Sequence, residues 1–176
     1  MAFQSSVALL QGFGVPGEIY QDAPWIVLTY TLRSGAQPNV VGATAYTITS
    51  QGVAQAGSGG TLGFAGILAV PKSYALFGTA NAPLAPTLTL NNETQAELLT
   101  EGMMVVTLPA AAAIGDYVIY NNTTGALATM APGDTLTAGY SFANAVVSQY
   151  TQGIAGTALA VIQVSTVINP IPVPAP

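Results

Sequence analysis

The sequence predicts a mainly β fold whose body is a small β-barrel or sandwich. Two observations carry this prediction. Many short segments are rich in β-branched and aromatic residues, the residue types that strands favour. Turn-forming residues separate these segments at short intervals, and the 176-residue chain contains 19 Gly and 12 Pro. Many short strands with closely set turns are typical of sandwiches and barrels.

The expected strands follow one another along most of the chain. Residues 26–32 (IVLTYTL) alternate toward their end, and residues 43–49 (ATAYTIT) alternate more clearly. The longer apolar run at 61–70 contains glycines, which in a strand indicate a bulge or close packing. The other expected strands are residues 87–90, 103–108, 117–120, 126–130, 142–150 and 158–166.

One hairpin is well specified. The segment YVIY at 117–120 is followed by the turn-forming residues NNTTG at 121–125 and then by the next expected strand at 126–130. Gly125 can adopt the positive φ that a five-residue loop often needs. We therefore expect these two strands to pair.

Residues 91–102 (NNETQAELLTEG) fit either a helix or a strand. Thr94 and Glu97 match a capping box, and Gly102 matches a helix stop. In a helix, however, Glu93, Glu97 and Glu101 would stack at i, i+4 and i+8, where like charges repel. A strand that enters a bulge at Gly102 is the rival, and the pattern alone leaves both open.

Composition divides the chain into three parts. Residues 1–60 are rich in Gly, Gln, Ser, Thr and Pro and are expected to form an extended N-terminal arm, with a flexible linker at 50–60 (SQGVAQAGSGG). Residues 61–166 hold most of the regular apolar pattern and are expected to form the β-barrel or sandwich body. Residues 167–176 are a Pro-rich C-terminal tail, for which polyproline II or disorder is the natural state.

Charged residues are rare, at 5% of the chain against roughly 25% in a typical soluble domain. The bases are Arg33 and Lys72, and the net charge is -5. Two cations cannot neutralise many phosphates, so nucleic acid is not an expected partner. A chain with so little solubilising charge is expected to stay packed against other protein.

The chain has no His and no Cys, which removes the usual nucleophiles, bases and zinc or copper ligands. We therefore expect no metal and no other cofactor. The uncharged runs are broken by polar residues and Pro, so a membrane is not an expected partner. The first 14 residues contain no Lys or Arg, so we expect no secretory signal peptide.

Acidic residues are the only side chains left that could catalyse a reaction. Glu93, Glu97 and Glu101 could bind a metal if helical, but a solvated face explains them better. Asp116 and Asp134 could form a glycosidase pair, but each follows a Gly in a turn, where Asp bonds its own backbone. We therefore expect no enzymatic activity and assign no catalytic residue.

Three side chains are candidates for a protein interface. Arg33 and Lys72 could each pair with an acid at a subunit contact, and exposed solubilising charge is the alternative for both. Trp25 precedes a strongly apolar strand, and Trp is enriched at interface centres. An ordinary core position is the alternative for Trp25.

A series of segments, in this order, resembles the structural cement (capsid decoration) proteins of tailed bacteriophages. The segments are residues 64–74, 84–90, 96–102, 115–120, 124–127, 142–147 and 158–162. The similarity is dense over 61–166 and looser over the first 60 residues, where residues 1–4 and 14–18 look like the start of that family. Phe3, within this start, is a fourth candidate interface residue.

The resemblance implies a small β-rich body with an extended N-terminal arm, and it tilts residues 91–102 toward a strand with a bulge. It also implies a homotrimer in the virion, bound to the outer capsid surface, that bridges major capsid protein subunits and resists the pressure of packaged DNA. No catalytic residues are known for the family. The acidic balance fits the outside of a shell, because a DNA-facing protein is usually basic.

A different class of function stays open at this point, a phage tail-fibre or adhesin-type carbohydrate-binding module. Such a module would present aromatic side chains on loops. The candidate aromatic residues are Tyr20, Tyr46, Tyr74, Tyr140 and Tyr150.

Overall fold

The regular elements of the protein are all β-strands in the part that the structure describes. The computed structural model describes residues 14–20, 24–57, 63–70, 88–154 and 157–165. The prediction of a mainly β fold is confirmed. The strands are β1 (Ile19–Tyr20), β2 (Ile26–Thr31), β3 (Asn39–Val40), β4 (Ala45–Ile48), β5 (Ala54–Ala56), β6 (Phe64–Leu68), β7 (Thr89–Leu90), β8 (Gln95–Leu108), β9 (Tyr117–Asn121), β10 (Leu127–Met130), β11 (Tyr140–Ile154) and β12 (Thr157–Val164).

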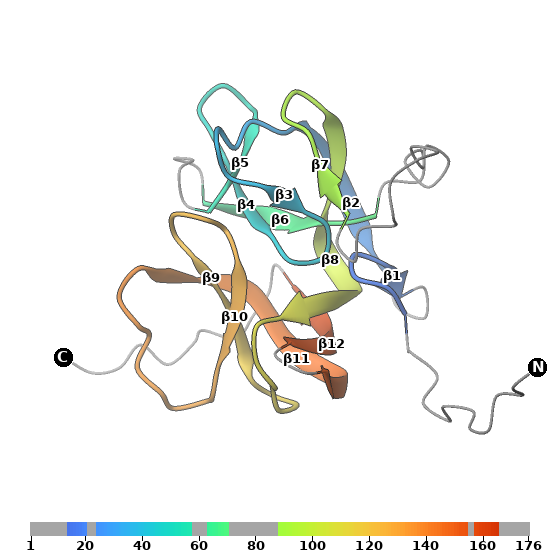
Figure 1. Cartoon of the computed structure of the whole chain (residues 1–176), viewed down its shortest axis with the longest axis vertical. Helices are drawn as coiled ribbons and strands as arrows, with labels where there is room; N and C mark the ends of the chain where they lie inside the picture. The colour runs from blue at the N-terminus through green and yellow to red at the C-terminus, as the bar shows by residue number, and fades with distance from the viewer. Residues whose placement is uncertain (1–13, 21–23, 58–62, 71–87, 155–156, 166–176) are drawn as a thin grey trace, which may run out of the picture.

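The main sheet is antiparallel and runs in the order β10-β9-β11-β12-β8-β6-β4-β5. β1 and β2 also pair with β8, and β3 pairs with β7 in a small separate sheet. Figure 1 shows β2 to β7 in the upper part of the molecule and β9 to β12 in the lower part, with β8 between them. The sheet does not close, so the sandwich form of the prediction fits and the closed barrel does not.

The long strand β8 joins the two parts. Its first half pairs with β2, from Thr31 opposite Gln95 to Ile26 opposite Glu101. Its second half pairs with β12, beginning where Val164 lies opposite Gly102. The segment 91–102, which fitted helix or strand, is therefore strand from residue 95 onward.

Two buried clusters explain why this segment prefers a strand. We call the buried group that contains Leu32, Tyr46, Ala96 and Leu98 the upper cluster. The buried group that contains Leu99 is the lower cluster. The alternating side chains of a strand can serve a core on each face, whereas a helix would bury one stripe. The lower cluster is the larger one and contains residues from β8, β9, β11 and β12.

The expected hairpin at 117–130 is confirmed. β9 and β10 pair from Tyr120 opposite Leu127 to Tyr117 opposite Met130. Gly125 has φ 73° in the connecting turn and donates its N–H to Asn121 O at 2.8 Å.

Three short strands escaped the sequence pattern. β1 and β3 have two residues each, too few to show alternation. β5 lies inside the segment 50–60 that was expected to be a flexible linker. Its Ala54 and Ala56 are buried in the upper cluster, so small side chains there reflect tight packing against β4 rather than flexibility.

Much of the predicted arm takes part in the sheet, because β2, β4 and β5 fall within residues 26–56. Residues 14–20 are also tied to the body. Gly17 donates its N–H to Val105 O at 2.7 Å and accepts the N–H of Val70 at 2.9 Å. Residues 1–13 and 166–176 lie outside the described residues, so the division into arm, body and tail stays a prediction.

Candidate interface

The strand β2 presents an exposed apolar surface. Trp25, Ile26 and Leu28 are 41%, 50% and 45% exposed. Val27 is partly buried against the lower cluster and Tyr30 against the upper one. No charged residue occurs between Pro24 and Leu32. Val27 and Tyr30 thus pack β2 against the body, whereas Ile26 and Leu28 are exposed to solvent.

Trp25 is positioned by a glycine on the neighbouring strand. A Cβ added to Gly102 would lie 2.7 Å from the Trp25 Cβ and 3.2 Å from the Pro24 carbonyl oxygen. Gly102 also has φ 123°, a conformation that side chains rarely adopt. The chain at Pro24 and Trp25 can therefore lie close to β8 only because residue 102 has no side chain.

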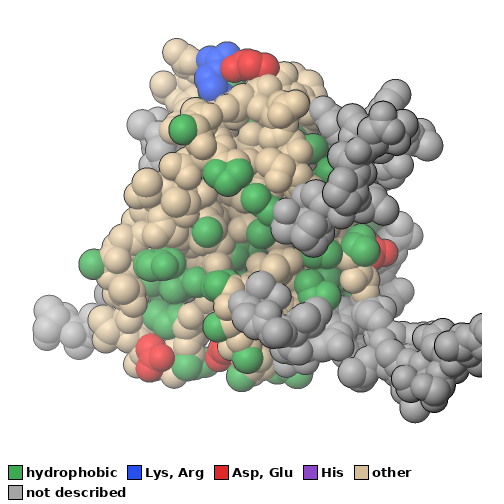
Figure 2. Space-filling view, viewed as in Figure 1, with side chains coloured by type: hydrophobic (Ala, Val, Ile, Leu, Met, Phe, Trp, Pro, Cys, Tyr) green, Lys and Arg blue, Asp and Glu red, His purple; other side chains and the backbone are tan. Residues whose placement is uncertain are grey.

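The other end of β2 leads into a bidentate ion pair. Arg33 donates from Nε to Glu93 Oε1 at 2.8 Å and from Nη2 to Glu93 Oε2 at 3.1 Å. The hydrogen bonds from Arg33 hold the pKa of Glu93 below its ordinary value, and Glu93 raises the pKa of Arg33. Figure 2 shows basic (blue) and acidic (red) side-chain atoms side by side at the top of a face that is otherwise mostly uncharged.

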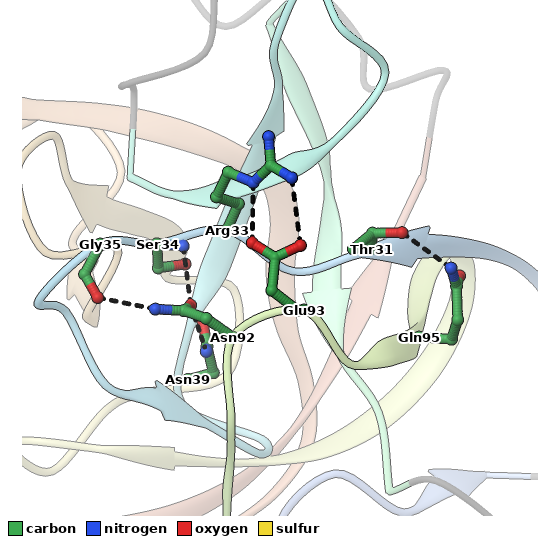
Figure 3. Close-up of polar contacts among 8 residues, drawn as sticks. All are labelled: Thr31, Arg33, Ser34, Gly35, Asn39, Asn92, Glu93 and Gln95. Atoms are coloured by element: carbon green, nitrogen blue, oxygen red, sulfur yellow. Dashed lines mark hydrogen bonds and ion pairs between the residues drawn. The ribbon is translucent and has the colours of Figure 1, made fainter.

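A network of amide and hydroxyl groups lies beneath this pair and joins two loops (Figure 3). Asn92 Oδ1 accepts the Ser34 N–H at 2.9 Å and Asn39 Nδ2 at 3.1 Å, and Asn92 Nδ2 donates to Gly35 O at 2.7 Å. The buried Tyr46 hydroxyl donates to Asn39 Oδ1 at 2.9 Å. We call Ser34, Asn39, Tyr46 and Asn92 the amide clasp. It fixes the backbone on both sides of the ion pair, so the pair sits on a rigid base.

The structure places two of the four predicted interface residues. Trp25 directly precedes β2 and Arg33 follows it by two positions, so the two residues flank the same strand. The partner of Arg33 is Glu93 of its own chain. Phe3 and Lys72 lie outside the described residues.

Sequence reasoning missed the amide clasp and the specific role of Glu93. Glu93 has φ 64°, which is uncommon for a residue other than Gly. The pair of asparagines at 91–92 could have signalled a turn there. Nothing in the sequence pattern linked Asn39 to Asn92, which are 53 positions apart.

Two of the other residues considered for chemistry or ligand binding, Asp116 and Tyr46, have structural roles. Asp116 Oδ2 accepts the Ala113 N–H at 2.8 Å within a turn. Tyr46, one of the aromatic residues considered for carbohydrate binding, is fully buried. Among the described residues, no three His, Cys, Asp or Glu side chains gather in a way that could hold a metal ion. Within the same residues, no helix is long and apolar enough to span a membrane.

The exposed apolar side chains of β2 and the scarcity of charge are features of surfaces that contact other proteins. The family described as "Structural cement protein (E217 gp24/Pam3 gp6)" matches residues 3–165. The chain therefore belongs to this family, and it is a structural cement protein of the phage capsid.

A solved structure supports the fold. A chain of "The capsid of Myoviridae Phage XM1" has a TM-score of 0.58 to this protein at 19% identity, over 94% of this chain and 99% of that chain. Comparison with curated proteins gives no match. The resemblance noted in the sequence is thus confirmed at the level of the family.

Proposed function

We propose that this protein is a non-enzymatic homotrimer that binds the outer surface of the shell and bridges major capsid protein subunits. The observation that carries the proposal is the family match over residues 3–165. The net charge of -5 supports an outside position, because a surface that faces packaged DNA would usually be basic. A trimer with closed cyclic symmetry would bury part of the weakly charged surface.

The proposed contacts draw on the interface residues already described. Trp25 is half exposed at the start of β2, where an aromatic anchor can enter a pocket of a neighbour. The Arg33–Glu93 pair offers hydrogen-bonding groups at the other end of the strand. Phe3 and Lys72 remain proposed contacts, and the extended N-terminal arm is proposed to carry Phe3 to a neighbouring subunit.

Reconstitution tests this function. Shells assembled from the major capsid protein would be mixed with the purified protein, sedimented, and imaged by electron cryomicroscopy. We expect saturable binding with a copy number comparable to that of the capsid protein, and trimers on the outer face. A few copies per particle, or no binding, would contradict the proposal and point to a tail component. Mass photometry of the free protein tests the trimer separately.

A further inference from the structure

The main-chain groups of β2 alternate between its two sides. Leu32 donates its N–H to Thr94 O at 2.9 Å and accepts the Glu93 N–H at 2.7 Å, so its main-chain groups point toward the β8 side. Arg33, the next residue, turns the other way and donates its N–H to Ala54 O at 2.8 Å. This is the alternation of an antiparallel strand.

The same alternation applies to the residues of β2 that precede Leu32. It leaves part of the side of β2 that faces away from β8, its outer edge, without a neighbouring strand. Val27, Thr29 and Thr31 direct their N–H and C=O groups away from β8. At the end of the strand the outward side of Thr31 and Arg33 is already occupied by Ala54 of β5, which forms a parallel bridge with Leu32. Val27 and Thr29 have no such neighbour, because β8 is the one strand that pairs with them in the described part of the chain. These two outward residues form a short template for another strand.

The outer edge also lacks the usual protection. Proteins shield edge strands with charges, prolines or bulges. Here Pro24 and the register shift between Ile26 and Val27 protect only the beginning of the strand. Residues 27–31 carry no charge, and the exposed Leu28 lies among them. An edge like this is suited to attachment.

The charges beside β2 indicate the chemistry of the partner. Glu97 and Glu101 of β8 lie opposite Thr29 and Ile26. Arg33, the one cation among the described residues, is already held by Glu93. An added strand would lie two strand spacings from β8, about 10 Å, which a lysine and a glutamate side chain can span together. The surface therefore complements an apolar segment that also carries a cation.

A second copy of the chain fits this edge less well. Pairing β2 with the β2 of another copy would place Glu97 and Glu101 along both sides of the ribbon, with no free described cation to balance them. Such pairing also has two-fold symmetry, whereas a trimer needs contacts between different surfaces.

We infer that the outer edge of β2 binds an extended, apolar segment of the capsid protein that carries at least one Lys or Arg, as an added strand along residues 27–29. Main-chain hydrogen bonds supply affinity in this mode, and side chains supply specificity. The inference rests on the proposed function and names the contact by which it works.

Thr29→Pro tests the inference, with Thr129→Pro as a matched control. Proline at position 29 removes an outward N–H and leaves the bonds to β8 intact. Thr129 lies on β10, which is also an edge strand, because it pairs only with β9 in the described residues. Asn121 donates to Ala126 O at 2.9 Å and Leu127 to Ala43 O at 3.1 Å, so the N–H of Thr129 also points outward.

We expect Thr29→Pro to weaken binding to capsid shells about tenfold or more, with wild-type melting temperature and oligomeric state. Thr129→Pro should bind like wild type. Equal binding by Thr29→Pro and wild type overturns the inference. Loss of the oligomer in Thr29→Pro also overturns it and assigns the edge to a contact between copies. Failure of the wild type to bind shells overturns the proposed function and the inference with it.

Two further measurements do not depend on the proline variant folding. Hydrogen exchange of the shell-bound wild type should show new protection at the amides of Val27 and Thr29, and none at Thr129. Unchanged exchange at these two β2 amides contradicts strand addition. Glu97→Lys should weaken shell binding, whereas Asp134→Lys, in an exposed loop, should not. A Glu97→Lys variant that binds shells equally well overturns the requirement for a basic partner.

Discussion

Trp25 lies directly against Gly102, and the two residues fix how the chain enters the edge of the sheet. A side chain at residue 102 would begin 2.7 Å from the Trp25 Cβ and 3.0 Å from its Cα. The contact sits where β8 changes partner from β2 to β12. Gly102 thus allows the chain at Trp25 to approach β8 closely at the start of β2.

Replacing Gly102 by Ala should destabilise the protein by about 3 kcal/mol, because strain at φ 123° adds to the collision with Trp25. Gly52→Ala is the control, since Gly52 has φ 75° but no atom near the added methyl. It should cost about 1 kcal/mol. Chemical denaturation measures both, and equal losses would show that the contact with Trp25 is unimportant.

Acid titration should reveal the Arg33–Glu93 pair. Arg33 holds the pKa of Glu93 below its ordinary value, so the pairing stabilises the fold at neutral pH and its contribution disappears as pH falls through that lowered pKa. In Arg33→Ala the pKa of Glu93, followed by NMR, should rise to the ordinary range. Arg33→Lys should lie between, because lysine keeps the charge but lacks the two-pronged geometry. An unchanged Glu93 titration in Arg33→Ala would contradict the pairing.

Tyr46→Phe should cost about 1–2 kcal/mol of folding free energy, since it leaves the buried Asn39 Oδ1 without its donor. Tyr117→Phe is the matched control, because its half-buried ring packs edge-on against Phe142 and the substitution keeps that contact. It should change stability little. Urea unfolding compares the two, and a neutral Tyr46→Phe would show that the clasp does not depend on this hydroxyl. Burial also raises the pKa of Tyr46, so its absorbance should titrate above that of ordinary tyrosines.

Two N-terminal deletions separate attachment from folding. Removal of residues 2–13 should keep the melting temperature and reduce shell occupancy, as expected for an arm that reaches a neighbour. Removal of residues 2–20 should also lower stability, because it deletes β1 and the Gly17 bonds to Val105 and Val70. Thermal unfolding and co-sedimentation with shells measure the two effects. Full occupancy after removal of residues 2–13 would contradict a role for the arm.

Local pattern was enough to predict most strands, because their side chains alternate or their turns contain Gly, Pro and Asn. The hairpin at 117–130 is an example, since Gly125 marks its turn. β5 could not be predicted, because Ala54 and Ala56 look like linker residues until β4 packs against them. The amide clasp was equally invisible, since Asn39 and Asn92 meet only through tertiary folding.

Arg33 was a candidate interface residue because it is one of two bases, and Trp25 because it precedes an apolar strand. The structure shows that the two residues flank the same strand, β2. The sequence pattern could not reveal that Glu93 of the same chain pairs with Arg33. Nor could it reveal the free edge of β2, which depends on the direction of main-chain groups. That direction follows from the register with β8, and register is set by the packing of the two cores.

The shared strand β8 also has a mechanical consequence. A pull applied to β2 loads its hydrogen bonds to the first half of β8, and the same backbone continues into the second half, which is bonded to β12. When the pull runs along the strand, the load is shared by rows of bonds that must slip together, rather than opening one at a time. The contact proposed at the edge of β2 would place the load on these rows.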